Sequence, residues 1–174
     1  MKTEKRYLVP GDYMADPAVH VFDGKLYIYP SHDWESGIAE NDNGDHFNMK
    51  DYHVYSMDDV MNGEITDHGV VLSTGDIPWA GRQLWDCDVA FKDGKYYMYY
   101  SANEHLYVAT SDSPLGPFRQ QGTYQMNNLL GSEKCIDSHV FFDDDGKAYL
   151  FFVRFTDGNC IWMCELEDDY MTPI

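Results

Sequence analysis

Three segments of the chain share one alternation of apolar and polar residues. Each begins with an aspartate, runs through a short apolar strand, turns at Asp-Gly-Lys, and continues in an aromatic strand. An Asp-Gly turn between alternating apolar runs is a strong signal for a β-hairpin. The pattern therefore predicts three hairpins, over residues 16–33, 86–103 and 137–154.

Each hairpin is followed by further apolar stretches of strand length. A third strand is expected at residues 52–56, 106–110 and 160–164, and a fourth around residues 69–73 and 122–125. After the third repeat only residues 170–174 remain. No amphipathic helical stretch competes with these strands. The chain is therefore predicted to be all-β, with successive strands grouped as in the blades of a β-propeller.

The spacing of the repeats supports this grouping. Asp16 and Asp86 lie 70 residues apart, and Asp86 and Asp137 lie 51 apart, whereas a four-stranded blade takes roughly 40–50 residues. An insertion over residues 34–50 explains the longer first period. We expect blade one over about 12–73, blade two over about 84–126, and an incomplete blade three over about 135–174. Propellers have about 4 to 8 blades. The sequence therefore predicts that the chain contains about two and three-quarter blades of a propeller.

Composition narrows the range of partners. The formal net charge is −18, from 30 Asp and Glu against 12 Lys and Arg, and such a surface repels nucleic acid and anionic lipid. No stretch approaches the roughly 18–20 apolar residues of a membrane span, and the amino terminus lacks the apolar core of a signal peptide. We therefore expect a cytoplasmic protein that binds neither nucleic acid nor membranes.

The repeats carry their aspartates at one structural position. Asp16, Asp86 and Asp137 each begin the first strand of a predicted blade. In a propeller these strands line the central channel, so three carboxylates would converge near one end of it. An aspartate at the start of a strand can also serve only to stabilise a turn, and repetition alone does not separate these two roles.

Short motifs around these aspartates carry a resemblance to a known family. They are Ala15-Asp16-Pro17-Ala18, Trp85-Asp86-Cys87-Asp88-Val89, Ile136-Asp137-Ser138-His139 and the segment 108–118. In this order and spacing, from about residue 8 to residue 174, the chain resembles the amino-terminal portion of glycoside hydrolase family 43, the five-bladed propellers of arabinofuranosidase or xylosidase type. The resemblance implies inverting hydrolysis of arabinose- or xylose-containing glycosides.

The resemblance also implies catalytic roles. Asp16 matches the general base of the family, and Asp137 matches the aspartate that raises the pKa of the general acid and orients it. The family's acid is a glutamate of blade four, beyond these residues. We interpret Glu133, Glu165 and Glu167 as surface carboxylates, so the isolated chain is expected to be inactive. An alternative is a non-catalytic carbohydrate-binding propeller, or one subunit of a split enzyme.

Two departures from the family pattern affect the expected sugar contacts. The second motif usually carries one aspartate, which Asp88 matches, so Asp86 is an additional one. In the third motif Ser138 and His139 follow the aspartate, where a proline is common. Residues expected to contact the sugar cluster at one end of the channel, although each alone fits a packing role equally well; they are His32, Asp33, Trp34, Arg82, Trp85, Asp86, Asp88 and His139.

No cofactor is expected within this chain. The histidines show no metal-ligand spacing such as H-x-x-x-H, so no metal site is predicted among these residues. The resemblance implies that calcium can occupy the channel of a complete propeller, commonly through a histidine of a late blade. An incomplete ring exposes strand edges, which leaves self-association through the unpaired blades open.

Overall fold

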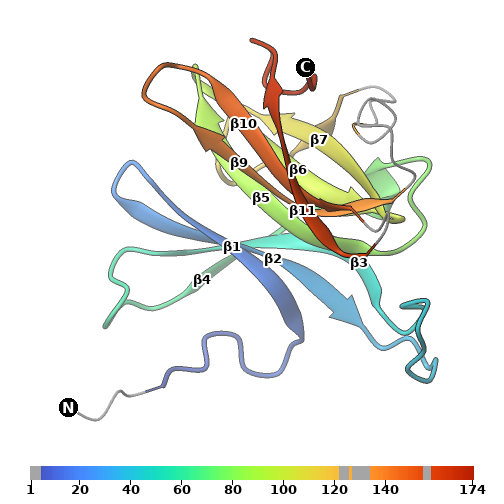
Figure 1. Cartoon of the computed structure of the whole chain (residues 1–174). Helices are drawn as coiled ribbons and strands as arrows, with labels where there is room; N and C mark the ends of the chain where they lie inside the picture. Colours follow the sequence, from blue (N-terminus) through green and yellow to red (C-terminus); the bar gives the residue numbers. More distant parts are fainter. Residues whose placement is uncertain (1–4, 122–125, 127–133, 155–157) are drawn as a thin grey trace.

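Three antiparallel sheets follow one another along the chain. The structure is a computed structural model that describes residues 5–121, 126, 134–154 and 158–174. In each sheet the strands are neighbours in chain order (Figure 1). The first sheet contains β1 (Met14–Phe22), β2 (Lys25–Trp34), β3 (Asn48–Met57) and β4 (Thr66–Ser73), and a single 3-10 turn, Thr74–Asp76, follows it. The second contains β5 (Leu84–Lys92), β6 (Lys95–Ala102), β7 (His105–Ser111) and β8 (Arg119–Gln120), and the third β9 (Cys135–Phe142), β10 (Ala148–Arg154) and β11 (Cys160–Leu166).

The predicted Asp-Gly hairpins are confirmed. In the first two turns the aspartate and the glycine both have positive φ: 50° and 78° for Asp23 and Gly24, and 50° and 80° for Asp93 and Gly94. Two consecutive left-handed residues produce the turn twist that matches paired strands, and Asp-Gly adopts it at low cost. Local chemistry therefore sets the register of these two hairpins.

The fourth strand of the first sheet is confirmed as well. β4 contains the predicted residues 69–73 and pairs with β3. The second sheet ends in β8, which pairs with β7, and the strand expected around residues 122–125 lies outside the described residues. In the third sheet the residues after β11 fold back along that strand. The Ile174 amide donates a 2.9 Å hydrogen bond to the Glu165 carbonyl.

The second sheet packs between the other two. Adjacent residues of a strand point to opposite faces, so Tyr100 packs toward the first sheet with Tyr29 and Tyr52, while Tyr99 packs toward the third with Leu150. These four tyrosines and the leucine are fully buried. The first strands of the sheets, β1, β5 and β9, contact one another in sequence, as the channel-lining strands of a propeller would.

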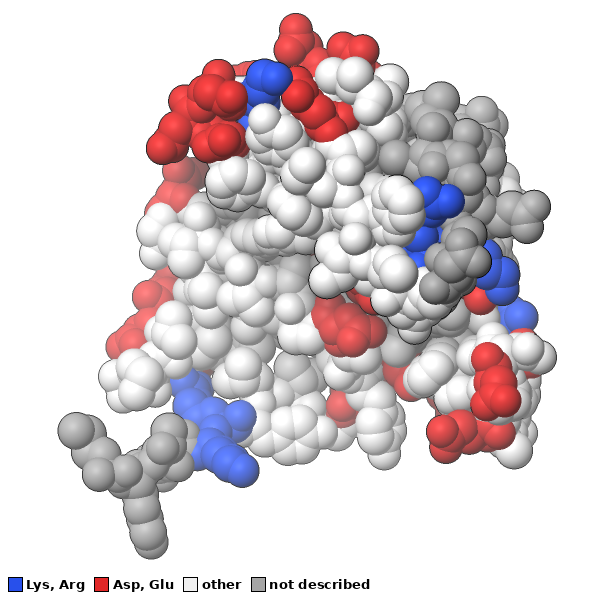
Figure 2. All heavy atoms as spheres, viewed as in Figure 1, with Lys and Arg blue, Asp and Glu red and all other residues white. Residues whose placement is uncertain are grey.

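The surface carries the acidity of the sequence. Acidic side chains gather at the exposed tip of the β9–β10 hairpin, Asp143–Asp145, and Lys and Arg form small separate groups on the face shown in Figure 2. Within the part of the chain that the structure describes, no helix has the length and apolarity needed to cross a lipid bilayer.

Candidate functional site

A β-bulge presents the repeated aspartate in every sheet. The pairing register of the first strand shifts by one residue around it, between Ala15 and Ala18, between Leu84 and Cys87, and between Ile136 and His139. Asp16 and Asp137 sit at φ 47° and 57°, a left-handed conformation that aspartate tolerates better than most residues. Because a bulge bends the strand and redirects a side chain, the repeat has a geometric role.

Asp86 is the most enclosed of these aspartates. The Ser101 hydroxyl donates to its Oδ1 at 2.7 Å, and the Ser138 amide donates to its Oδ2 at 3.0 Å. Its side chain is also hydrogen bonded to Asp137. Burial raises the pKa of Asp86 most, the Ser101 hydrogen bond opposes that rise, and the charge of Asp137 adds to it, which brings the pKa to about 7. Asp86 therefore keeps its proton up to near neutral pH, beside Asp137.

Asp16 belongs to the same electrostatic cluster. Partial burial raises its pKa, and repulsion from Asp137 raises it further. Asp16 and Asp137 are both exposed, whereas Asp86 is half-buried. The three bulges thus bring Asp16, Asp86 and Asp137 together, with Asp137 interacting with both of the others.

Asp88, two residues further along β5, lies in a different setting. It is buried between β1 and β9, where His20 Nε2 is 2.7 Å from its Oδ1 and His139 Nδ1 is 2.9 Å from its Oδ2. The Val140 amide donates a third bond at 3.0 Å. Burial alone would raise the pKa of Asp88, but the hydrogen bonds from His139 and His20 outweigh it and hold that pKa well below its usual range.

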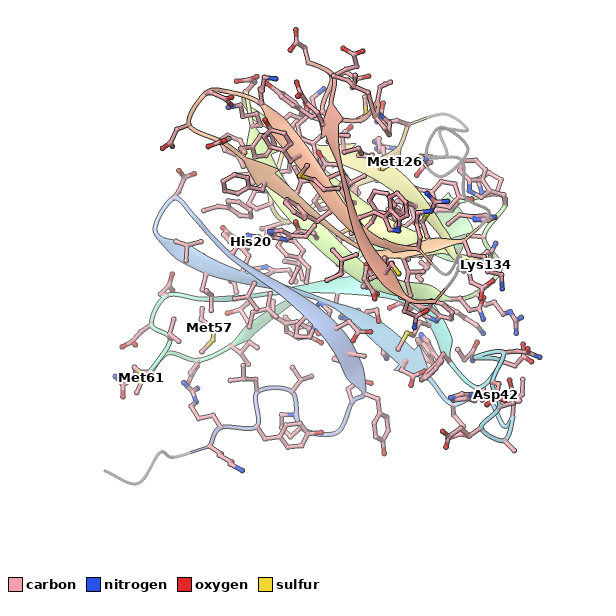
Figure 3. All side chains as sticks on the ribbon, in the orientation of Figure 1. His20, Asp42, Met57, Met61, Met126 and Lys134 are labelled. Atoms are coloured by element: carbon pink, nitrogen blue, oxygen red, sulfur yellow. The ribbon has the colours of Figure 1, made fainter. Side chains whose placement is uncertain are left out.

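The Asp88 network links all three sheets. Figure 3 shows His20 projecting from β1 toward the strands of the other sheets. The hydrogen bond to Asp88 raises the pKa of His139, against the effect of partial burial. Both oxygens of Asp88 are thus hydrogen bonded within the protein, and Asp88 links the three sheets. His139 keeps most of its side chain exposed. The expected sugar contacts of both residues stay predictions.

His32 and Trp34 form another cluster at the end of β2. The buried His32 ring lies between Asp12 and Asp51, at 3.0 Å and 2.9 Å. Trp34 packs on it with ring centroids 4.5 Å apart, and its Nε1 donates to Asp51 Oδ2 at 2.9 Å. The indole is held at one edge but is 50% exposed, so it offers a fixed apolar surface.

The neighbouring Asp33 holds the backbone of the first sheet. Its Oδ1 accepts a 3.3 Å hydrogen bond from the Asn48 amide, and its own amide donates to the Tyr13 carbonyl at 3.0 Å. Asp33 therefore fixes the start of the insertion that carries Trp34 to the surface.

Arg82 and Trp85 contact the insertion between β2 and β3. Arg82 pairs with Asp45 at 2.7 Å, and Trp85 meets Phe47 edge-on with centroids 6.3 Å apart. Trp85 also lines a pocket of about 430 Å³, with Asp42 on the insertion and Lys134 before β9 as other lining residues (Figure 3). The insertion therefore forms one wall of a pocket of mixed polar and apolar lining, next to the start of β5, which carries Asp86.

Several residues of these clusters were missed from the sequence. The sequence gives a weak indication for Ser101, because this serine occupies the same position in its repeat as Ser31. His20, Asp51 and His53 had none, since their partners lie on other strands and no local spacing marks them.

The comparisons with known proteins decide the family. The model for glycosyl hydrolases family 43 matches residues 8–174. The chain belongs to this family. The predicted resemblance is therefore confirmed, and the three sheets are blades of the β-propeller that such enzymes share.

Individual relatives and solved structures agree with this assignment. The chain is 73% identical over 157 residues to a xylosidase/arabinosidase of Bacteroides ovatus, covering 87% of this chain and 47% of that protein. It is 52% identical over 151 residues to xylosidase/arabinosidase 43A of Humicola insolens, covering 83% and 45%. Among solved structures it is similar to RS223 β-xylosidase, with a TM-score of 0.84, 50% identity, and coverage of 98% of this chain and 60% of that one.

A second solved structure is similar over much the same region. It is CoXyl43, a β-xylosidase/α-arabinofuranosidase from a compost metagenome determined with xylotriose, with a TM-score of 0.83, 44% identity, and coverage of 95% and 58%. The chain spans about half the length of the curated relatives it matches.

Proposed function

We propose that this chain supplies the base side of the active site of an inverting glycosidase that cleaves arabinose- or xylose-containing glycosides. The observation that carries the proposal is the coupling of Asp16, Asp86 and Asp137 on three neighbouring bulges. Family membership and relatives named as xylosidases and arabinosidases support the substrate class.

Inverting hydrolysis assigns different protonation states to two carboxyl groups. One carboxylate removes a proton from water as the water attacks the anomeric carbon, and one carboxylic acid protonates the departing oxygen; the two stand roughly 6.5–9.5 Å apart. Asp16 is exposed, so a water molecule can reach it, and we assign it the base role. Asp137, hydrogen bonded to Asp86, is the neighbour whose charge would keep the acid protonated.

The acid itself is proposed to come from outside these residues. Glu165 lies near the end of β11, the outer strand of the third sheet, away from the bulges on β1, β5 and β9. Glu133 lies outside the described residues. We therefore propose that activity needs the further blades that the longer relatives contain. No step is assigned to calcium, whose expected ligand belongs to a late blade.

Aromatic side chains on the first two blades suit a sugar substrate. Trp34 and Trp85 present indole faces at the ends of the first two blades, and apolar ring faces of sugars stack well on such surfaces. CoXyl43 was determined with xylotriose, a xylose oligomer. A carbohydrate of this kind is the partner we propose for the complete site.

A non-catalytic or split-subunit function is the alternative. The family match and the relatives named as xylosidases and arabinosidases favour the glycosidase over it. Apolar residues on the last strand, Ile161 and Met163, are 80% and 55% exposed. We propose that this strand associates with further blades, or with another copy of the chain.

Hydrolysis of aryl glycosides tests the proposal. The 174-residue chain, and the same chain extended with the second half of the Bacteroides ovatus relative, are assayed on 4-nitrophenyl β-D-xyloside and α-L-arabinofuranoside. We expect turnover only in the extended chain. Asp16→Asn should lower kcat by about 10²- to 10⁴-fold, the usual contribution of a general base, while the control Asp144→Asn at the β9–β10 tip leaves it unchanged.

Two outcomes would contradict the proposal. Activity of the short chain equal to that of the extended one would place the acid within these residues. Near-normal turnover of the folded Asp16→Asn variant would remove Asp16 from the base role. A split subunit is supported if the short chain gains activity when the second half is added as a separate polypeptide.

A further inference from the structure

A second cluster of ionisable side chains lies on the first sheet, separate from the aspartate bulges. His32 on β2 and Asp51 and His53 on β3 each offer one ligand atom, and these atoms lie within 4.8 Å of one another. His32 and Asp51 are buried, and His53 is half-buried. The group is thus shielded from bulk water but open on the side of His53.

Both ring nitrogens of His32 lie against carboxylates. Its Nδ1 is 2.9 Å from Asp51 Oδ1, and its Nε2 is 3.0 Å from Asp12 Oδ1. Ionised carboxylates only accept hydrogen bonds, and a neutral imidazole carries a single N–H. With a neutral ring and two ionised carboxylates, only one of these two contacts is an N–H···O hydrogen bond, and the other ring nitrogen offers a lone pair.

His53 repeats the arrangement from the other side of Asp51. Its Nε2 is 3.5 Å from Asp51 Oδ1, and its Nδ1 is 3.3 Å from Asp67 Oδ1. Each histidine thus turns one nitrogen toward Asp51 and the other toward a different carboxylate, Asp12 or Asp67. Histidines that bind metals almost always place the second nitrogen against such a group, which fixes the ring and its tautomer.

The distances match a tetrahedral ion after a small adjustment. Zinc binds histidine nitrogen and carboxylate oxygen at about 2.0–2.2 Å, so two tetrahedral ligands lie about 3.3–3.5 Å apart. The His53–Asp51 separation of 3.5 Å already fits. The 2.9 Å between His32 and Asp51 needs to open by about half an ångström. Trp34 holds the other oxygen of Asp51 in place.

Negative charge accumulates around this cluster. In the described part of the chain, the ion pairs of Asp12, Asp51 and Asp67 are all with histidines. A cation held at Asp51 would offset this charge.

We propose that His32, Asp51 and His53 bind a divalent transition-metal ion of the zinc type, with the fourth position open to water. Two imidazoles and one carboxylate suit zinc and its neighbours, whereas calcium takes six or more oxygen ligands. This site is therefore distinct from any calcium in the propeller channel, and it arises from strand pairing that no sequence spacing reveals. The ion would tie β2 to β3 beneath Trp34.

Titration with zinc chloride tests the site. The 174-residue chain is freed of metal with EDTA, exchanged into a non-chelating buffer, and titrated by calorimetry. We expect one Zn²⁺ per chain and a rise in Tm with added metal, because binding to the folded state stabilises it. Asp67→Asn, which removes a supporting carboxylate, should weaken binding by about 10- to 100-fold.

Two ligand variants and a matched control make the result specific. His53→Gln and Asp51→Asn should each lose at least as much affinity as Asp67→Asn. His68→Ala removes an exposed histidine of the same sheet, bonded to Ser56, and should bind like the parent. The half-buried His53 keeps the test valid if the Asp51 variant fails to fold. Absence of a one-to-one complex, or unchanged affinity in folded His53→Gln, would overturn the proposal.

Discussion

Asp86 and Asp88 lie two residues apart on β5 and belong to two regions with opposite electrostatics. Asp86 faces the aspartates of the neighbouring bulges, and its pKa is raised to about 7. Asp88 faces the interior between the sheets, and its pKa is lowered well below the usual range. Burial pushes both values upward, so burial does not explain the difference.

The partners of each carboxylate explain it. Asp86 accepts two hydrogen bonds from neutral donors, Ser101 and Ser138, but it is also bonded to the acidic Asp137. Asp88 contacts the imidazoles of His20 and His139 and accepts a backbone bond. β5 thus carries two contrasting carboxyl groups: Asp86 keeps its proton up to near neutral pH, whereas Asp88 is ionised and links the three blades.

Removal of the Asp88 carboxylate should change the stability of the folded protein more than the other substitutions. Asp88→Ala leaves His20, His139 and the Val140 amide without their shared acceptor in a buried site. We expect a loss of about 3 kcal/mol or more in the free energy of unfolding, measured by urea denaturation. The control Asp144→Ala, on the exposed β9–β10 tip, should stay within about 0.5 kcal/mol of the parent. A similarly small change in Asp88→Ala would refute the linking role.

Asp86→Asn should alter how stability depends on pH. Because the pKa of Asp86 is raised on folding, the folded state binds more protons than the unfolded state between about pH 4 and 7, and stability falls as pH rises through that window. Asparagine cannot ionise, so the variant escapes this decline. We expect its stability relative to the parent to improve steadily from pH 4 to pH 8 in urea unfolding. A difference independent of pH would contradict the raised pKa.

The smallest effect concerns His139. The hydrogen bond with Asp88 raises the pKa of His139 above its ordinary value of 6.5. The charged His139 therefore contributes its full stabilisation of the folded state below pH 6.5, and this stabilisation is lost as pH rises through the raised pKa. Asp88→Asn should return the pKa of His139 toward its ordinary value, as followed by NMR of the imidazole. Asp144→Asn serves as the control. An unchanged titration in Asp88→Asn would show that another group perturbs His139.

Repetition and turn chemistry made much of this fold predictable from the sequence. Asp23-Gly24 and Asp93-Gly94 specify hairpins through local backbone preferences, and the recurrence of Asp16, Asp86 and Asp137 marked the strands that meet at the centre. Blade boundaries and individual sugar contacts stay predictions.

The partners of these residues could not be predicted, because tertiary packing chooses them. Asp88 matched the family's aspartate, yet nothing local indicates that His20, 68 residues earlier, and His139, 51 residues later, converge on it. Likewise His32 meets Asp51 through the register of β2 and β3. The bulges themselves have no local signal, since the same residues would fit a regular strand.

Carbon-13 NMR of aspartate side-chain carboxyls over pH 3–9 tests the central claim most directly. The claim is that Asp86 and Asp137 act as one coupled pair at the proposed active site. In the 174-residue chain we expect the Asp86 signal, assigned with Asp86→Asn, to titrate near pH 7 and to shift to lower pH in Asp137→Asn. Titration of Asp86 close to the ordinary aspartate value of about 3.9 in both proteins would contradict the coupling and the function built on it.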